Sequence, residues 1–395
     1  MLAAAFDVVI VGGGLVGLAL ARALSDSGLT IGLVEREAAA APPEIGWDVR
    51  VYAISPGSES FLRSLDAWPG NAQRMAPVER MCIFGDRPGS KLEFDAYRSH
   101  VSRLATIVEN GLLMQALRNA LDITGKVERF QGERCAAVQW EADAAKLQLQ
   151  TGTALRARLL VGADGADSWL RTQAGIQVSE TSYGQTALVA NFSCELPHRG
   201  TAFQWFREDG VLALLPLPEQ QVSIVWSARD DLAERLMGLT GAQLADEVAA
   251  ASGNVLGSLQ LITPPARFAL RCMRVQRLIG PRLALVGDAA HNFHPLAGQG
   301  VNVGFQDARE LSRVLNERGP ERDVGAIALL RRYERARREH IAAMTAATHG
   351  LQRLFNHTGT ALAWMRNLGL NLTDRLPPLK SLLVAQALGS PTFHD

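Results

Sequence analysis

LALVGDAAHNFHPLAGQGVNVGFQD, residues 283–307, is the stretch that decides the fold of this chain. It opens with the continuous apolar run 283–286, which is typical of a parallel strand buried on both faces. Gly287 and Asp288 end that run. Glycine lets a ligand approach the backbone closely, and an acid at the carboxyl end of a strand can accept hydrogen bonds from sugar-like hydroxyls. The stretch therefore predicts a strand that ends at a ligand site.

The second half of the stretch predicts a helix that begins near Gly300. The apolar residues that follow have helical spacing, at Val301, Phe305, Ala308, Leu311 and Leu315. The first turn of a helix offers unpaired N–H groups and the positive end of a dipole, so it favours a ligand that carries or develops negative charge. An ordinary connection from strand to helix, with no ligand, is the alternative interpretation.

A glycine-rich loop follows a second buried-strand pattern at residues 7–11. The loop, GGGLVG at residues 12–17, has the form G-x-G-x-x-G and leads into a helix rich in Ala and Leu. In this pattern Gly12 permits the tight turn, Gly14 lets the backbone approach a pyrophosphate, and Gly17 lets the helix pack closely on its strand. The loop therefore predicts a bound dinucleotide.

Three polar residues after this loop are candidates for contacts with the same ligand. Glu35 ends the next strand pattern, residues 30–34, and is placed to accept hydrogen bonds from the ribose of an adenosine without a 2′-phosphate. Arg50 is a candidate to reach the pyrophosphate, and a solvated surface arginine is its alternative. A third strand-to-loop crossing, residues 159–168, places Asp164 as a second hydroxyl acceptor.

Beyond residue 179 the hydrophobic pattern changes to a period of two. The segments 186–194, 201–206, 211–216 and 222–227 alternate in this way and are separated by turn signals. They predict an antiparallel sheet that forms a separate layer, with one face closing over the cofactor as a substrate pocket. Phe203, Trp205 and Trp226 are candidates to line that pocket, and simple core packing is their alternative.

Helical spacing predicts four further helical regions, at residues 102–121, 231–252, 324–355 and 362–388. The third is long and amphipathic, and arginines crowd its first half: Arg331, Arg332, Arg335, Arg337 and Arg338. The first interpretation of this cluster is a solvated face. The alternative is attraction to an anionic membrane surface, such as the inner face of the cytoplasmic membrane.

The composition bounds the class of protein. The 395 residues carry zero net charge, with 47% hydrophobic and 20% charged residues, which is typical of a globular protein and gives no sign of nucleic-acid binding. The four cysteines lie far apart and form no C-x-x-C pair, which argues against a metal site or a disulfide framework and favours a reducing compartment. We find no signal peptide or membrane span and predict a cytoplasmic protein.

Taken together, the motifs resemble those of the p-hydroxybenzoate-hydroxylase-like flavin monooxygenases, and within them the hydroxylases of ubiquinone biosynthesis. Three separated motifs carry this resemblance: residues 12–17 with Glu35, residues 162–165 with Ser168 and Arg171, and Gly287-Asp288. The narrower branch rests on residues 294–302, 214–217, 368–369 and 374–378. The resemblance therefore runs almost from end to end.

The resemblance implies an α/β fold, α+β overall, in which a Rossmann-like FAD-binding domain is interleaved with an antiparallel-sheet substrate domain and followed by a helical C-terminus. The implied FAD-binding domain is discontinuous and comprises residues 1–75, 99–180 and 273–355. The substrate domain comprises residues 76–98 and 181–272, and the C-terminal helical segment comprises residues 356–395.

The resemblance also assigns roles to residues. Arg50 is expected at the pyrophosphate, Asp288 at the ribityl chain and Pro295 at the flavin ring. The full set of expected cofactor contacts is Gly12, Gly14, Leu15, Val16, Gly17, Glu35, Arg36, Arg50, Asp164, Asp288, Pro295, Gly298, Gln299, Gly300, Val301 and Asn302. The candidate catalytic residues are His291, His294 and Pro295. The two histidines are candidates to relay a proton from the substrate phenol, and anchoring of the loop is the alternative.

The implied activity is hydroxylation of the aromatic ring of a prenylated phenol with dioxygen, through a flavin hydroperoxide that the protein shields from water. NAD(P)H is the expected electron donor, and a quinone-biosynthesis complex at a membrane surface is the expected partner, with an oligomer left open. The alternatives are a flavoprotein of the same fold with other chemistry, such as a prenyl-chain reductase, and an FAD-stabilised scaffold subunit. A halogenase would usually show a W-x-W-x-I-P pattern, which this chain lacks.

Overall fold

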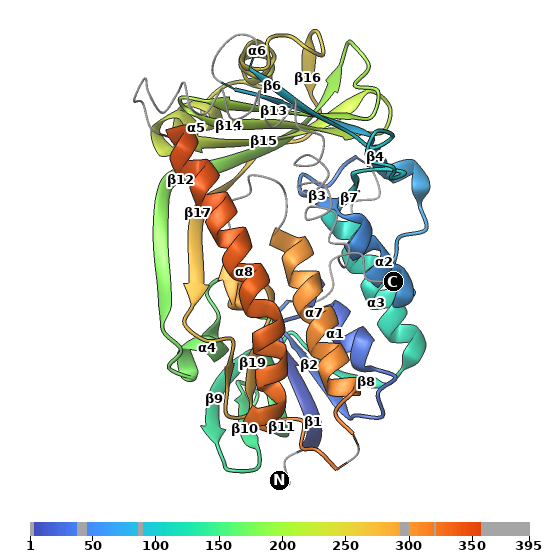
Figure 1. Ribbon diagram of the computed structural model, residues 1–395, viewed down its shortest axis with the longest axis vertical. Helices are drawn as coiled ribbons and strands as arrows, with labels where there is room; N and C mark the ends of the chain where they lie inside the picture. Colours follow the sequence, from blue (N-terminus) through green and yellow to red (C-terminus); the bar gives the residue numbers. More distant parts are fainter. Residues whose placement is uncertain (1–3, 38–45, 86–89, 293–299, 320, 357–395) are drawn as a thin grey trace.

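The computed structural model describes residues 4–37, 46–85, 90–292, 300–319 and 321–356, with side chains described up to residue 344. Figure 1 shows two main layers, a mostly parallel sheet flanked by helices and an antiparallel sheet above it. This arrangement confirms the predicted mixture of a Rossmann-like unit and an antiparallel sheet. Residues 356–395, predicted as a C-terminal helical segment, lie outside the described residues, apart from the last residue of the long helix at 356.

The parallel sheet is built from the apolar runs that the sequence singles out. Its strand order is β18-β19-β11-β1-β2-β8, with β10 and β9 added beside β11. These strands are β18 (Ile279–Gly280), β19 (Leu283–Leu285), β11 (Ala154–Gly162), β1 (Ala4–Val11), β2 (Ile31–Glu35), β8 (Val127–Gln131), β10 (Ala145–Leu149) and β9 (Cys135–Trp140). Val8, Val9 and Ile10 of β1 are fully buried, as expected for a central strand covered on both faces.

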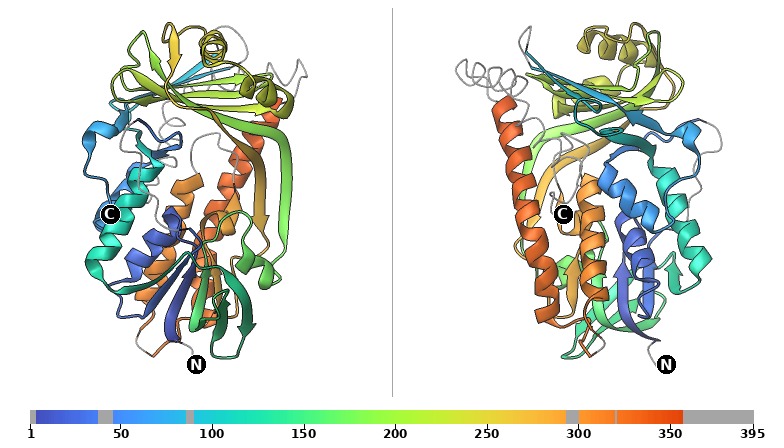
Figure 2. Two further views of the ribbon diagram at one scale, coloured as in Figure 1. Left: turned by 180° about the vertical axis from the view of Figure 1, so that it is seen from behind. Right: turned by 45° about the vertical axis from the view of Figure 1, so that its right-hand side comes forward.

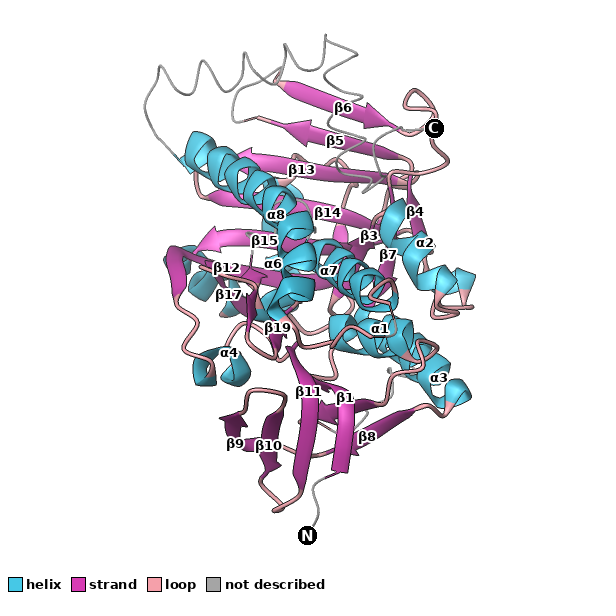
Figure 3. Cartoon of the chain, turned by 60° about the horizontal axis from the view of Figure 1, so that its bottom comes forward, coloured by secondary structure: helices cyan, strands magenta, loops and turns pink. Residues whose placement is uncertain are grey.

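Helices cover this sheet and carry the loops at its edge (Figures 1 and 3). They are α1 (Leu15–Leu24), α2 (Pro56–Ser64), α3 (Asn110–Thr124), α4 (Trp169–Gln173), α7 (Gly300–Asn316) and α8 (Ile327–Asn356), with short 3-10 helices η1 (Ala72–Arg74) and η2 (Gly287–Ala289). The helix predicted to begin near Gly300 is therefore confirmed as α7. Apolar residues of α1, α3, α7 and α8 pack with the sheet in one core.

The antiparallel sheet has the strand order β20-β17-β12-β15-β14-β13-β5-β6, with β16 paired to β12. These strands are β20 (His291–Asn292), β17 (Ala266–Val275), β12 (Val178–Cys194), β15 (Gln221–Arg229), β14 (Gly210–Leu217), β13 (Thr201–Arg207), β5 (Arg80–Phe84), β6 (Lys91–Asp95) and β16 (Leu259–Leu261). Its outer face is covered by α5 (Asp230–Met237) and α6 (Gly241–Ala251), which lie above the sheet in both views of Figure 2.

A third, small sheet lies between the two layers. Its strands are β3 (Val51–Ile54), β7 (Ala105–Glu109) and β4 (Ala76–Val78), in the order β3-β7-β4. Val51 and Ala53 pack with Leu215 and Leu217 of the antiparallel sheet. Ile54, on the other side of β3, belongs to the core of the parallel sheet. The small sheet therefore joins the two layers.

Two helix predictions are wrong in detail. The helix predicted over residues 102–121 is strand β7 followed by α3, because Thr106, Ile107 and Val108 are β-branched and pair with β3. The helix predicted over residues 231–252 is two helices. The first ends at Met237 with Gly238 as its C-cap, and the second begins after Thr240, whose side chain forms a capping box with that of Gln243 at the start of α6.

Candidate functional site

The three sequence motifs meet at one edge of the parallel sheet. Backbone hydrogen bonds of 2.8 Å from Ala163 N to Val11 O and of 3.0 Å from Val286 N to Gly162 O join the ends of β1, β11 and β19. Because these strands are parallel, their carboxyl ends lie side by side. Loops at such an edge are the usual ligand-binding position in open α/β sheets.

The geometry of the first loop fits the predicted turn at Gly12 and the predicted close packing at Gly17, and the pyrophosphate contact at Gly14 stays a prediction. Gly12 has a φ of +117°, which favours glycine, and a Cβ on Gly17 would lie 1.9 Å from the Gly12 carbonyl oxygen. A Cβ on Gly14 would meet nothing within 4 Å. Gly14 is also the N-cap of α1 and contributes no side-chain cap. The backbone here is therefore open to an anion such as a pyrophosphate.

Glu35 stands beside this loop and offers an unused acceptor. Its side chain is 2% exposed, and its Oε1 accepts a 2.8 Å hydrogen bond from Arg129 Nε. Arg118 Nη2 lies 3.7 Å from Oε2, and no donor among the described residues makes a hydrogen bond to that oxygen. A buried acceptor without a hydrogen bond fits a ligand hydroxyl such as that of a ribose. Arg36 instead is exposed and pairs with Glu37 at 2.9 Å.

The second half of the candidate site lies around Asp288, which belongs to η2 and is accessible to solvent. The protein crowds this carboxyl, and the resulting desolvation raises its pKa above the ordinary value. The charge of Asp288 also affects the pKa of Tyr52 on β3. Burial and the negative charge of Asp288 raise the pKa of Tyr52, while the Arg50 guanidinium opposes that rise. Arg50 is exposed, with its guanidinium carbon 5.9 Å from the centroid of the Phe268 ring.

Val16 of α1 joins the glycine loop to the part of the site around Asp288. It packs into a notch made by Gly287, whose φ is +58°, and Gly304 of α7. A Cβ on Gly304 would lie only 2.5 Å from Val16 Cγ2. The sequence prediction did not include Gly304, although a glycine inside an amphipathic helix pattern is a signal of close packing.

The loop after β11 and helix α4 contact the turn that carries Asp288. Asp164 accepts hydrogen bonds from Ser168 Oγ at 2.6 Å and from Leu170 N at 3.1 Å, so its carboxylate shapes its own loop. Arg171 of α4 then donates to Ala289 O of η2 over 2.9 Å. This bond ties the second motif to the third. A contact between Asp164 and a ligand stays a prediction.

Asn302 and His291 are both buried and both make structural contacts. The Asn302 Oδ1 accepts from Ser55 N and its Nδ2 donates to Ala53 O, each over 2.9 Å, so the side chain fastens β3 to α7. His291 is 1% exposed and its Nε2 lies 2.6 Å from Asp307 Oδ2. This geometry supports the anchoring alternative for His291. His294, Pro295, Gly298 and Gln299 lie outside the described residues.

The prediction that Phe203, Trp205 and Trp226 line a substrate pocket is wrong. Trp226 is 1% exposed and packs with α5 and α6 on the outer face of the antiparallel sheet, and Phe203 and Trp205 pack against the same cluster. Alternation along a strand defines two faces, but the sequence does not say which face looks inward.

The inner face of the antiparallel sheet carries the other set of residues. Asn191 of β12 identifies this face, since its Nδ2 donates to Asp48 O, near Arg50, over 3.1 Å. Val225 and Ala213 are cross-strand neighbours on this same face, and both are half-buried. The inner face therefore carries apolar side chains, such as Val225 and Ala213, beside the polar side chains of Asn191 and Ser223.

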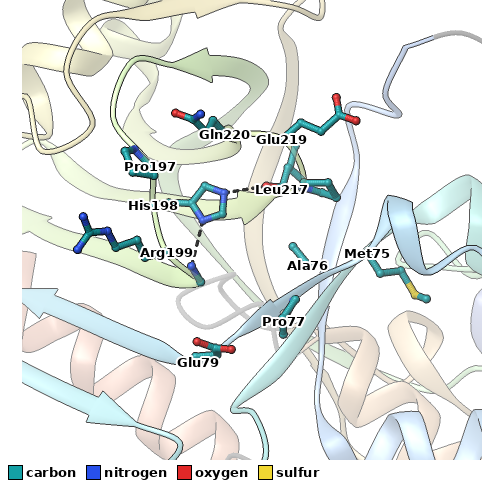
Figure 4. Close-up of a pocket in the computed structure, with 12 residues that line it drawn as sticks. Met75, Ala76, Pro77, Glu79, Pro197, His198, Arg199, Leu217, Glu219 and Gln220 are labelled. Atoms are coloured by element: carbon teal, nitrogen blue, oxygen red, sulfur yellow. Dashed lines mark hydrogen bonds between the residues drawn. The ribbon is translucent and has the colours of Figure 1, made fainter.

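A separate cavity of about 390 Å³ lies where β4 meets two turns of the antiparallel sheet (Figure 4). His198 is in its wall, but both ring nitrogens are engaged. Gly200 N donates to Nδ1 over 3.2 Å, and Nε2 donates to Leu217 O over 2.8 Å. Partial burial lowers the pKa of His198, which keeps the ring neutral. The predicted cofactor contacts are not among the residues of this wall.

Comparison with known proteins agrees with this geometry. Residues 5–348 match the FAD binding domain family. The ubiquinone hydroxylase UbiL of Rhodospirillum rubrum is 35% identical, over 97% of this chain and 90% of that protein. The 3-demethoxyubiquinol 3-hydroxylase of Escherichia coli is 36% identical, over 97% and 98%. The chain belongs to the FAD-dependent ubiquinone hydroxylase family.

Solved structures support the fold of this family. The p-nitrophenol 4-monooxygenase PnpA of Pseudomonas putida superimposes with a TM-score of 0.78 at 16% identity, over 99% of this chain and 100% of that one. Klebsiella pneumoniae HpxO, complexed with FAD and uric acid, gives a TM-score of 0.72 at 20% identity, over 97% of both chains. As a family member, this chain is an FAD-dependent monooxygenase.

The open backbone at Gly14, the unused oxygen of Glu35 and the accessible Asp288 fit FAD. Among the described residues, no helix is both long enough and apolar enough to span a membrane.

Proposed function

We propose that this enzyme hydroxylates the aromatic ring of a prenylated phenol in ubiquinone biosynthesis, using dioxygen and NAD(P)H. The observation that carries the proposal is the similarity to ubiquinone hydroxylases over 97% of the chain, which spans both the FAD groove and the antiparallel sheet. Val225 and Ala213 on the inner face of that sheet support it, because a prenylated ring needs apolar contacts.

Each part of the groove has a task in this reaction. When bound, FAD would supply the redox chemistry that activates dioxygen, and one of the two oxygen atoms of dioxygen would enter the ring. The start of α1 binds the pyrophosphate, Glu35 accepts from the ribose, and Asp288 accepts from the ribityl chain. The start of α7 at Gly300 stabilises negative charge on the cofactor through its N–H groups. The apolar side chains of the inner sheet face exclude water from the reacting atoms.

Product mass in a purified assay tests the proposal. The protein with FAD and NAD(P)H is incubated with a prenylated phenol under ¹⁸O₂, and one labelled oxygen atom is expected in the product. A product that gains two hydrogens instead would indicate a prenyl-chain reductase. NAD(P)H oxidation that a phenol does not accelerate, with no labelled product, would favour the scaffold alternative and overturn the proposal.

We also propose that the enzyme meets its prenylated substrate at an anionic membrane surface, within a quinone-biosynthesis complex. Arg331, Arg335 and Arg338 of α8 are exposed and supply positive charge. Co-sedimentation with vesicles that contain anionic lipid tests this, and binding is expected to weaken as salt concentration rises. Equal binding to neutral and anionic vesicles would contradict it.

A further inference from the structure

A buried network of charged side chains connects the long helix α8 to the turn that carries Asp288. Arg337 Nε donates to Asp307 Oδ1 over 2.6 Å. The other oxygen, Asp307 Oδ2, accepts from His291 Nε2 over 2.6 Å and from Gly287 N over 2.9 Å. The side chains of Arg337, Asp307 and His291 are 6%, 0% and 1% exposed. The Asp307 carboxylate therefore contacts both Gly287, at the start of η2, and His291, which follows η2 in the chain.

Arg337 also fixes the first turns of α7. Its Nη1 donates to Gln306 Oε1 and its Nη2 donates to Val303 O, each over 3.2 Å. Gly304, next to Val303, is the glycine that receives Val16 of α1. A single guanidinium thus sets how α7 sits against both η2 and the glycine loop.

The burial of Arg337 differs from what the arginine-rich pattern of α8 predicts. The cluster on α8 was expected to be a solvated face, yet Arg337 is buried while Arg335 and Arg338 are exposed. Among the described residues, Arg337 is the permanent cation paired with Asp307. A buried carboxylate without such a partner is costly and relaxes by taking up a proton or by shifting toward water.

We propose that Arg337 is a positioning residue for the FAD site, which acts through Asp307 on the Gly287-Asp288 turn and couples cofactor binding to the packing of α8. If Asp307 shifts, Gly287 N and His291 lose their acceptor, and Asp288 loses its fixed position in the groove. Coupling is reciprocal, so bound FAD also stabilises the contact of α8 with α7. The inference rests on FAD binding and is independent of which phenol is hydroxylated.

FAD affinity in three variants tests the proposal. Arg337→Met is expected to weaken FAD binding about tenfold, the equivalent of one charge-assisted hydrogen bond. Arg332→Met removes an arginine of the same helix that pairs with Glu317 at 3.5 Å rather than with Asp307, and is the matched control, with unchanged affinity expected. Arg337→Lys retains the charge and should recover most of the affinity. Flavin fluorescence gives the dissociation constant, and circular dichroism verifies that each variant is folded at the temperature used.

Hydrogen exchange on the wild-type chain provides a second readout that needs no variant. Amides in residues 330–341 of α8 are expected to exchange more slowly with FAD bound than after FAD is stripped from the full chain. If Arg337→Met does not fold, the comparison of hydrogen exchange with and without FAD tests the proposal by itself. Unchanged exchange in α8, or wild-type affinity in a folded Arg337→Met, would overturn the proposal. Failure of phenol hydroxylation would leave both FAD readouts intact.

Discussion

At the scale of single residues, the glycine loop shows how much a sequence can specify. The roles of Gly12, Gly14 and Gly17 follow from spacing alone, because each depends on the backbone within a few residues. The partnership of Asp307 with Arg337 could not be predicted in the same way. The two residues are 30 positions apart on different helices, and nothing in an arginine-rich pattern marks which arginine turns inward.

Two alanine substitutions in the loop are expected to affect different properties, one the stability of the fold and the other the affinity for FAD. Gly17→Ala places a Cβ 1.9 Å from a backbone oxygen and should lower the free energy of unfolding by about 1–3 kcal/mol. Gly14→Ala meets no protein atom and has an ordinary φ of −78°, so stability without FAD should be unchanged. FAD affinity should instead fall about tenfold, as one charge-assisted hydrogen bond is lost. Chemical denaturation and FAD titration separate the two effects.

This prediction fails if Gly14→Ala binds FAD as tightly as the wild type. Equal losses of stability in both variants would contradict it as well, because Gly14 would then have a packing role.

His198 predicts a pH dependence of stability. Its folded pKa lies below the ordinary value of 6.5, because burial disfavours the charged ring and outweighs the hydrogen bond to Leu217 O, which favours it. The unfolded chain therefore takes up the proton first as pH falls. The stabilising contribution is fully present above pH 6.5 and is lost as pH falls through the lower folded value. Thermal unfolding between pH 7.5 and 5 should show a smaller decline in His198→Gln than in the wild type.

At the scale of elements, the strands of the antiparallel sheet were predictable and their orientation was not. The alternation of apolar and polar residues predicted strands β12, β13, β14 and β15, because one face of each strand packs in an apolar core. Which face meets α5 and α6 depends on helices that follow later in the chain, so the aromatic residues were assigned to the wrong side. The helix predicted over residues 102–121 failed for a related reason, because tertiary pairing of β7 overrode a helical pattern.

The two faces of the sheet should respond differently to substitution. Trp226→Ala is expected to lower the free energy of unfolding by about 3–5 kcal/mol, as for large-to-small changes in a core, with little change in KM. Ala213→Phe adds volume on the half-buried inner face and should raise KM for the phenol while stability changes little. Steady-state kinetics and denaturation on both variants check this. A raised KM in a folded Trp226→Phe would place that residue at the pocket after all.

At the scale of the whole molecule, the FAD groove joins segments from both ends of the described chain. The Rossmann-like class followed from the glycine motif, and the interleaved domains were an implication of the family resemblance. Residues 293–299 lie outside the described residues. Because FAD is proposed to contact α1, η2 and α7 at once, it should stabilise the chain as one unit. At 100 times the dissociation constant, the free energy of unfolding should rise by about 2.7 kcal/mol. Scanning calorimetry at several FAD concentrations should show a single transition that moves upward, and two independently moving transitions would contradict this.

The place of β19 in the parallel sheet has a consequence for biosynthesis on the ribosome. β19 pairs with β11, and β11 pairs with β1, so the sheet edge proposed to bind the riboflavin half of FAD is completed by residues 283–285. At about 5–20 residues per second, the nascent glycine loop waits on the order of 10–60 s for that strand to emerge. From the synthesis of Gly162 until β19 emerges, the end of β11 offers an open edge. A truncated transcript that contains the complete G-x-G-x-x-G motif therefore encodes a product that can neither retain flavin nor close its own sheet.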